Sequence, residues 1–211
     1  MSRRGRLLVL EGLDGAGTTT QSRLLGARLA AGGRRVHVTA EPSGGPIGAL
    51  LRLALQGRVV GRGGVPLDPG ALALLFAADR LDHVAGEIEP RLAAGVDVIS
   101  DRFTLSSLAY QSIATGSPSW VAAINARAPV PDLTVFLEVR PAIALARRRA
   151  TGTAPELYEV DAFQRRVAAS YRRALAAVRR AGQRVVSLDG ERPIEEVAEA
   201  VAGLVAAPRR R

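Results

Sequence analysis

The sequence predicts an α/β domain in which a mostly parallel β-sheet is flanked by helices on both faces. Strand-like apolar segments alternate with helix-like segments along the chain, which is the pattern typical of such a sheet. A glycine-rich turn joins the first strand to the first helix. At 211 residues the chain fits one domain, 1–211, and we see no linker or internal repeat that would divide it.

Five segments have the apolar character of strands. We expect strands at residues 6–10, 35–40, 96–100, 133–139 and 184–188. The segments between them carry helical periodicity or helix-ending glycines, which predict helices at 19–31, 47–56, 71–94, 161–181 and after Pro193. Residues 57–70 are rich in glycine and proline, so we expect an irregular excursion there.

The composition narrows the classes of function. All 29 basic residues are arginine, and the net charge is +9, which favours an anionic partner. Because the arginines are spread out and aromatic residues make up only 4%, we expect small anions as ligands and no nucleic acid. No apolar run is long enough to cross a bilayer, and there is no cysteine, so we expect a cytoplasmic protein without membrane partners. We expect the basic tail 207–211 to be disordered.

The glycine-rich turn resembles a phosphate-binding loop. Its eight residues are Gly12, Leu13, Asp14, Gly15, Ala16, Gly17, Thr18 and Thr19. The Walker A pattern is G-x-x-x-x-G-K-[ST], in which backbone N–H groups beside a helix N-terminus hold phosphate oxygens. Thr19 can supply the hydroxyl that ligates magnesium, but Thr18 stands where the pattern has lysine. A plain glycine-rich turn explains the eight residues alone; the strand before them and the helix after them favour a phosphate site.

Two further groups of residues suit a second, nucleoside-binding side of the site. Asp14 lies inside the loop, where its carboxylate can accept a hydrogen bond from a sugar hydroxyl. Phe76 and Arg80 are four residues apart and share a helix face, so a ring and a guanidinium can hold a base together. The alternatives are a turn aspartate for the first, and a core phenylalanine beside a surface arginine for the second.

Charged residues also follow the third strand and occupy a later basic segment. Asp101 and Arg102 come directly after that strand, at the end where ligands of parallel sheets bind. Asp101 is placed to ligate magnesium or to orient an acceptor phosphate, and Arg102 to clamp that phosphate. The run Arg147, Arg148 and Arg149 precedes small residues, which suits a closing lid around 147–158. A structural ion pair and a solvated helix end are the alternatives.

Together these segments resemble the bacterial thymidylate kinase family over nearly the whole chain. The matching segments are EGLDGAG, TAEPSGG, LLFAADRLDHV, VISDRFTLSSLAYQ, PDLTVFLEV and DGERPIEEV. The resemblance implies a P-loop nucleoside monophosphate kinase fold with a five-stranded parallel sheet, a homodimer, and transfer of the γ-phosphate of ATP to dTMP with Mg²⁺. It also implies roles in binding the acceptor nucleotide: Asp14 on the sugar 3′-hydroxyl, Phe76 stacked on thymine, Arg80 hydrogen-bonded to the base, Arg102 on the phosphate, and Tyr110 and Gln111 lining the nucleoside pocket.

The sequence departs from the family pattern at three positions that concern phosphate. Thr18 replaces the loop lysine, Ala40 replaces an arginine before Glu41, and Leu157 stands where the lid typically has arginine. Removing one such electrostatic contact typically costs about 10²–10³ in rate. The arginine run can supply replacements when a lid closes. Two alternatives to a dTMP kinase therefore stay open: a nucleotide-binding protein with little or no turnover, and a kinase for a different nucleotide.

Overall fold

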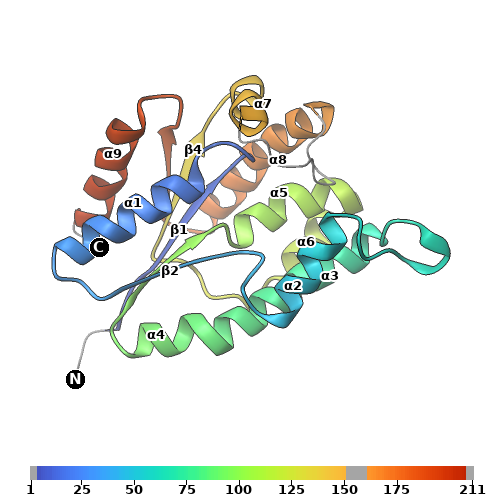
Figure 1. The fold of residues 1–211 in the computed structure, drawn as a ribbon, viewed down its shortest axis with the longest axis horizontal. Helices are drawn as coiled ribbons and strands as arrows, with labels where there is room; N and C mark the ends of the chain where they lie inside the picture. Colours follow the sequence, from blue (N-terminus) through green and yellow to red (C-terminus); the bar gives the residue numbers. More distant parts are fainter. Residues whose placement is uncertain (1–3, 151–160, 208–211) are drawn as a thin grey trace.

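The computed structural model describes residues 4–150 and 161–207, which form helices on both sides of one central sheet (Figure 1). The strands are β1 (Leu7–Gly12), β2 (Val36–Ala40), β3 (Asp97–Asp101), β4 (Leu133–Glu138) and β5 (Val185–Asp189). All neighbours pair in parallel, in the order β2-β3-β1-β4-β5. The five-stranded parallel sheet expected from the sequence is confirmed.

The place of each strand in the sheet follows from its burial. Every residue of β1 and β3 is buried, whereas β2 and β5, at the two edges, are mostly half-buried. Strands covered on both faces are largely apolar in parallel sheets, although β3 also buries Asp97, Ser100 and Asp101. β1 therefore lies at the centre, and both the glycine-rich loop and Asp101 lie at the carboxyl ends of adjacent strands.

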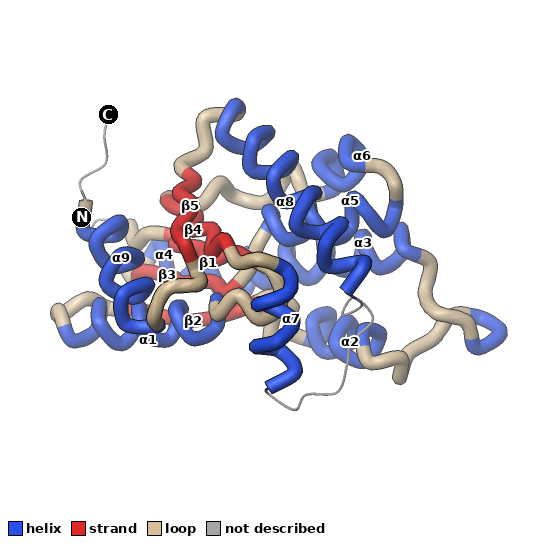
Figure 2. The backbone as a smooth tube through the Cα atoms, turned by 90° about the horizontal axis from the view of Figure 1, so that it is seen from above, coloured by secondary structure: helices blue, strands red, loops and turns tan. Residues whose placement is uncertain are grey.

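Helices cover both faces of the sheet. They are α1 (Thr18–Ala31), α2 (Pro46–Leu55), α3 (Pro69–His83), the π-helical turn η2 (Val84–Ile88), α4 (Glu89–Ala93), α5 (Thr104–Thr115), α6 (Pro118–Ile124), α7 (Pro141–Ala150), α8 (Asp161–Arg180) and α9 (Ile194–Ala206), with a short 3₁₀ turn η1 (Arg62–Gly64). Helices α1 and α9 contact each other on one face, and α5 and α8 pack together on the other (Figures 1 and 2).

Two features of the helices differ from the sequence-based expectation. The helix predicted at 71–94 starts at Pro69, capped by the Asp68 carboxylate, and is interrupted by the π turn before Pro90. Proline lacks the N–H that would continue the α-helical bonding pattern, which accounts for the irregularity. The sequence pattern also did not predict α5, α6 and α7, which form where their chain segments pack on neighbouring helices.

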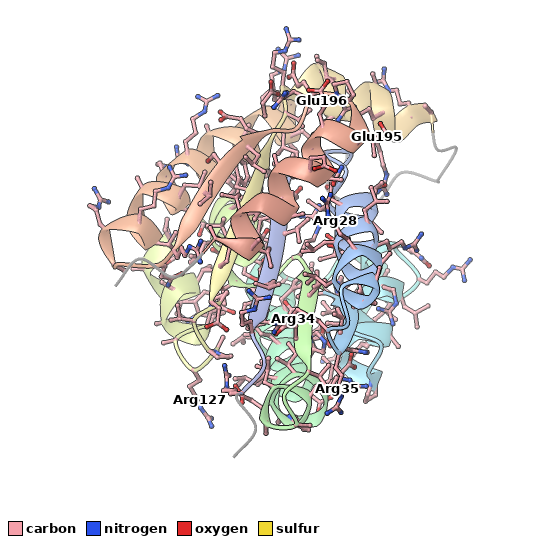
Figure 3. The ribbon with its side chains drawn as sticks, turned by 90° about the vertical axis from the view of Figure 1, so that its left-hand side faces the viewer. Arg28, Arg34, Arg35, Arg127, Glu195 and Glu196 are labelled. Carbon is pink, nitrogen blue, oxygen red and sulfur yellow. The ribbon has the colours of Figure 1, made fainter. Side chains whose placement is uncertain are left out.

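Several surface arginines come from separate parts of the chain. Figure 3 shows Arg28, Arg34 and Arg127 well apart on one side of the molecule. Arg28 pairs with Glu199, and Arg34 with the buried carboxylate of Asp97. Residues 151–158 of the expected lid, including Leu157, and residues 208–211 of the expected tail lie outside the described residues.

Candidate nucleotide-binding site

The loop between β1 and α1 has a backbone that only glycine readily adopts. Gly15 and Gly17 have φ angles of 88° and 95°. A Cβ atom at Gly15 would lie 2.1 Å from the carbonyl oxygen of Ala144, so the loop packs directly on α7. Helix α1 starts at Thr18, and the free N–H groups and positive dipole end of its first turn favour an anion at this position.

A large cavity of about 840 Å³ opens beside this loop. Its lining residues from the loop and the sheet are Asp14, Gly15, Ala16, Gly17, Thr18, Thr19, Asp101 and Arg102. Arg147 and Arg148 of α7 line it too, together with residues 190–194 that follow β5. The structure thus brings together most of the phosphate-side residues expected from the sequence. Gly12 and Leu13 are buried behind this wall, and Arg149 is exposed outside it.

Two arginines of α7, Arg147 and Arg148, line the larger cavity. Arg147 donates from Nη1 to the carbonyl oxygen of Gly190 at 2.8 Å, which ties α7 to the segment after β5. Arg148 is half-buried beside it. Thr18, the residue in the lysine position, is 6% exposed and brings a neutral hydroxyl. The cationic side chains around the cavity are therefore guanidinium groups from outside the loop.

Thr19 and Asp101 form an oxygen pair at the base of the cavity. The Thr19 hydroxyl donates to Asp101 Oδ2 at 2.5 Å, while Asp101 Oδ1 is buried and has no hydrogen-bond partner within the described part of the chain. A hydroxyl and a carboxylate with a free oxygen suit Mg²⁺, which prefers oxygen ligands and usually keeps waters and substrate phosphates as its other ligands. Among residues 4–150 and 161–207 there is no group of three His, Cys, Asp or Glu side chains that would hold a metal alone.

A second, smaller cavity of about 100 Å³ lies beside the first. All six acceptor-side residues expected from the sequence line it: Asp14, Phe76, Arg80, Arg102, Tyr110 and Gln111. Asp14 and Arg102 also line the larger cavity. Six further residues complete the lining of the smaller cavity: Glu41, Pro42, Leu55, Phe103, Ser106 and Ser107. Phe76 is half-buried and packs against the small apolar cluster formed by α2 and α3. The Oγ of Ser107 is buried without a hydrogen-bond partner in the described residues. Two adjoining cavities thus share one wall.

That shared wall is an ion pair between Asp14 and Arg102. Arg102 Nη2 lies 2.5 Å from Asp14 Oδ1, and the other carboxylate oxygen accepts from the Tyr110 hydroxyl at 3.0 Å and from Gln164 Nε2 at 3.1 Å. Burial disfavours the charged guanidinium, but the electrostatic effects of Asp14, Tyr110, Tyr171 and Asp101 together outweigh it and raise the pKa of Arg102. Burial and Asp14 also raise the pKa of Tyr110, so its hydroxyl stays a donor.

The backbone of Arg102 is itself unusual. Its φ angle is 72°, in the left-handed region that residues other than glycine rarely adopt, and such a conformation costs on the order of 1–3 kcal/mol. Arg102 Nη1 also donates to the carbonyl oxygen of Gly12 and to Ser106 Oγ, at 3.2 and 3.1 Å. The fold therefore holds a strained arginine against the glycine-rich loop, which is a common property of functional residues.

Glu11 is a buried acidic residue behind the site, lining neither of the two cavities, that sequence reasoning missed. Its carboxyl is fully buried at the end of β1 and accepts hydrogen bonds from the backbone N–H groups of Phe103 and Ser106, from Ser106 Oγ and from the Tyr171 hydroxyl. Burial raises the pKa of Glu11 to about 7, although the hydrogen bond from Ser106 and the charge of Arg102 act in the opposite direction. The signal available in the sequence was an acidic residue directly after an apolar strand.

Arg80 is buried to a degree the sequence did not indicate. It is 2% exposed, and Glu41 Oε2 accepts hydrogen bonds from its Nε and Nη2 at 2.9 and 2.6 Å. His83 is buried on the other side of Glu41, with Nδ1 3.3 Å from Glu41 Oε1. Arg80 thus lies in the wall of the smaller cavity, supported from behind by α3 and the end of β2.

The fold and the two adjoining cavities define a P-loop kinase of the nucleoside monophosphate class. Comparison with known proteins agrees and is more specific. The family model described as thymidylate kinase matches residues 10–201, and the chain belongs to this family.

Relatives from several organisms cover nearly the whole chain. It is 45% identical over 199 residues to a probable thymidylate kinase of Pyrobaculum aerophilum, covering 94% of this chain and 95% of the relative. It is 41% identical over 200 residues to the thymidylate kinase of Thermomicrobium roseum, covering 92% and 91%. A putative thymidylate kinase of Treponema pallidum is 37% identical, with 92% and 91% covered.

Proposed function

We propose that this enzyme transfers the γ-phosphate of ATP to dTMP, giving ADP and dTDP. The observation that carries the proposal is the pair of cavities that meet at Asp14 and Arg102. One has the glycine-rich loop and a helix N-terminus, which suit a triphosphate; the other has an aromatic ring and a buried arginine, which suit a nucleoside. Phosphate transfer requires such a common wall, because donor and acceptor must approach each other in line.

On the donor side, the loop N–H groups and the start of α1 would bind the ATP phosphates. Thr19 and Asp101 would hold Mg²⁺ through the hydroxyl and the free carboxylate oxygen. When bound, Mg²⁺ neutralises charge on the phosphates. Arg147 and Arg148 would approach the phosphates from α7 and supply the positive charge that Thr18 lacks.

On the acceptor side, the residues would act as the family resemblance implies. Phe76 would stack on thymine, Arg80 would donate a hydrogen bond to the base, and Asp14 would accept one from the sugar 3′-hydroxyl. Tyr110 and Gln111 would line the pocket. Arg102 would clamp the acceptor phosphate and partly exchange its contact with Asp14 for contacts to the phosphate oxygens.

A second candidate is a nucleotide-binding protein with little turnover, and Thr18 favours it. A neutral, buried hydroxyl replaces a charge that ordinarily stabilises the transferring phosphoryl group. A third candidate, a kinase for another nucleotide, is favoured by Ala40, since an exposed alanine stands where an arginine contact is expected. Both candidates retain the same two cavities.

A coupled assay that follows ADP formation separates the three candidates. Purified protein is supplied with ATP, Mg²⁺ and either dTMP, dUMP, dCMP or dGMP, and binding of each nucleotide is measured by calorimetry. Turnover of dTMP within the ordinary kinase range of about 1–100 s⁻¹ supports the proposal. Binding of dTMP with turnover below about a thousandth of that range supports the second candidate, and a better acceptor than dTMP supports the third.

We also propose that two copies form a homodimer, located in the cytoplasm, that binds nucleotides rather than nucleic acid. Leu50 and Leu53 of α2 and Leu74 of α3 are 39%, 39% and 50% exposed, on two helices that pack against each other. An apolar surface of this kind suits contact with a second copy. Light scattering after gel filtration tests this: a monomer mass at micromolar concentration refutes the dimer. None of the described helices has the length and apolar character needed to span a membrane.

A further inference from the structure

Arg80 is anchored from two opposite sides. On one side Glu41 accepts from Nε and Nη2, and the carbonyl oxygen of Phe103 accepts from Nη2 at 3.1 Å. On the other side Nη1 donates to Asn125 Oδ1. The hydrogen bonds between described residues therefore use one hydrogen of Nε, two of Nη2 and one of Nη1, which is four of the five N–H groups of the guanidinium. The second Nη1 hydrogen is left for a ligand.

Asn125 lies at the end of α6, away from both the phosphate loop and the sheet. It is 8% exposed, and its Nδ2 donates to the carbonyl oxygen of Val121 at 2.8 Å. Because Val121 offers only an acceptor and Arg80 only donors, the orientation of the Asn125 amide is fixed: Nδ2 faces Val121 and Oδ1 faces Arg80. The amide is thus held by its own helix and pointed at one atom of Arg80.

We propose that Asn125 is a positioning residue for recognition of the acceptor base. Its Oδ1 fixes one hydrogen of Arg80 Nη1, so that the other is offered to the smaller cavity, which Arg80 lines. A fixed N–H donor favours binding of a base that presents a carbonyl oxygen to it. It disfavours a base that presents an amino group at the same position, because two donors then face each other. This inference rests on the proposed function, since it assumes that the acceptor base occupies this cavity.

Loss of the Asn125 oxygen frees Nη1 to rotate and leaves one of its hydrogens without a partner. A buried donor without its acceptor typically costs about tenfold to a hundredfold in the equilibrium it affects. We expect Asn125→Ala to raise the KM for dTMP about tenfold or more and to lower the preference for dTMP over dCMP by a similar factor. The kcat and the KM for ATP should change by less than about threefold, because the larger cavity does not include Asn125.

The experiment compares three variants with the unaltered chain by steady-state kinetics, dTMP calorimetry and thermal unfolding. Asn125→Asp keeps an oxygen facing Arg80 but loses the donor to the Val121 carbonyl oxygen, so it should restore part of the dTMP affinity. Ser119→Ala, at an exposed position of the same helix, is the matched control and should behave as the unaltered chain.

Three outcomes overturn the inference, and they are distinguishable. An unchanged KM for dTMP in Asn125→Ala, with an active unaltered chain, refutes the positioning role alone. A lower kcat together with higher KM values for both dTMP and ATP in Asn125→Ala, with no rescue by Asn125→Asp, indicates that Asn125 only supports the fold. Failure of the unaltered chain to bind dTMP refutes the proposed function, and the inference with it.

Discussion

Glu11 offers a direct test of what burial does to this fold. In Glu11→Gln the Oε1 atom can still accept from the backbone N–H groups of Phe103 and Ser106. The amide nitrogen takes the place of Oε2 and can donate to the hydroxyl oxygens of Ser106 and Tyr171, which accept as readily as they donate. The substitution therefore removes the titration and keeps the shape and the hydrogen bonds.

The magnitude follows from the raised pKa. Burial raises the pKa of Glu11 from 4.5 to about 7, so between these values the folded chain binds a proton that the unfolded chain has released. The free energy of unfolding therefore falls as the pH rises from 4.5 to 7. At about 1.36 kcal/mol per pKa unit, the full loss is on the order of 3 kcal/mol, of which roughly 2.5 kcal/mol falls between pH 5 and pH 8.

Urea unfolding of both chains at pH 5, 6, 7 and 8 measures this loss. We expect the stability of the unaltered chain relative to Glu11→Gln to decrease by about 2–3 kcal/mol across the series. Glu195→Gln, at an exposed position of α9, controls for the change in net charge and should follow the unaltered chain (Figure 3). If the difference between Glu11→Gln and the unaltered chain is the same at every pH to within about 0.5 kcal/mol, Glu11 is ionised in the fold and the reasoning fails.

Three further predictions concern the larger cavity. Thr18→Lys should raise kcat by about tenfold to a hundredfold by restoring charge in the loop; an unchanged kcat would mean that the arginines already supply it. Arg147→Gln and Arg148→Gln should each lower kcat by at least about tenfold, whereas Arg149→Gln, exposed outside the cavity, should stay within about twofold; equal kcat in all three would remove α7 from catalysis. Asp101→Asn should raise the half-saturating Mg²⁺ concentration about tenfold; an unchanged Mg²⁺ titration would exclude Asp101 as a ligand.

The fold was largely predictable because its strands are buried on both faces. A fully covered strand is largely apolar without alternation, so β1 and β4 stand out in the sequence. The ends of the strands were less clear. We placed the end of β1 at residue 10 because Glu11 is acidic, but its carboxyl is buried and hydrogen-bonded, and the strand continues to Gly12.

The helices that the sequence did not predict depend on tertiary contacts. Helix α5 carries a serine-rich, weakly amphipathic sequence, and it is stabilised by packing against α8 and α3. Local propensity contains no information about such partners. The same limit applies to the long helix predicted at 71–94, where the π turn at 84–88 appears only in three dimensions.

The site was predictable as two sets of residues, but not as one arrangement. Motifs indicated Asp14, Arg102 and Tyr110 separately. Gln164 of α8 contacts Asp14, and Asn125 at the end of α6 contacts Arg80. The residues of these two pairs are 150 and 45 positions apart in the sequence. Neither pair carries a local pattern, because the spacing that matters is set by the sheet order and by helix packing.

The ion pair between Asp14 and Arg102 has a thermodynamic consequence. Since both side chains belong to both cavities, a ligand that draws Arg102 away from Asp14 changes the charge that a ligand in the other cavity meets. Linkage then requires reciprocity: the factor by which the acceptor changes the affinity for the donor equals the factor by which the donor changes the affinity for the acceptor. Whichever nucleotide arrives first, the equilibrium affinity of the ternary complex is the same, and only the rates of assembly can favour one order.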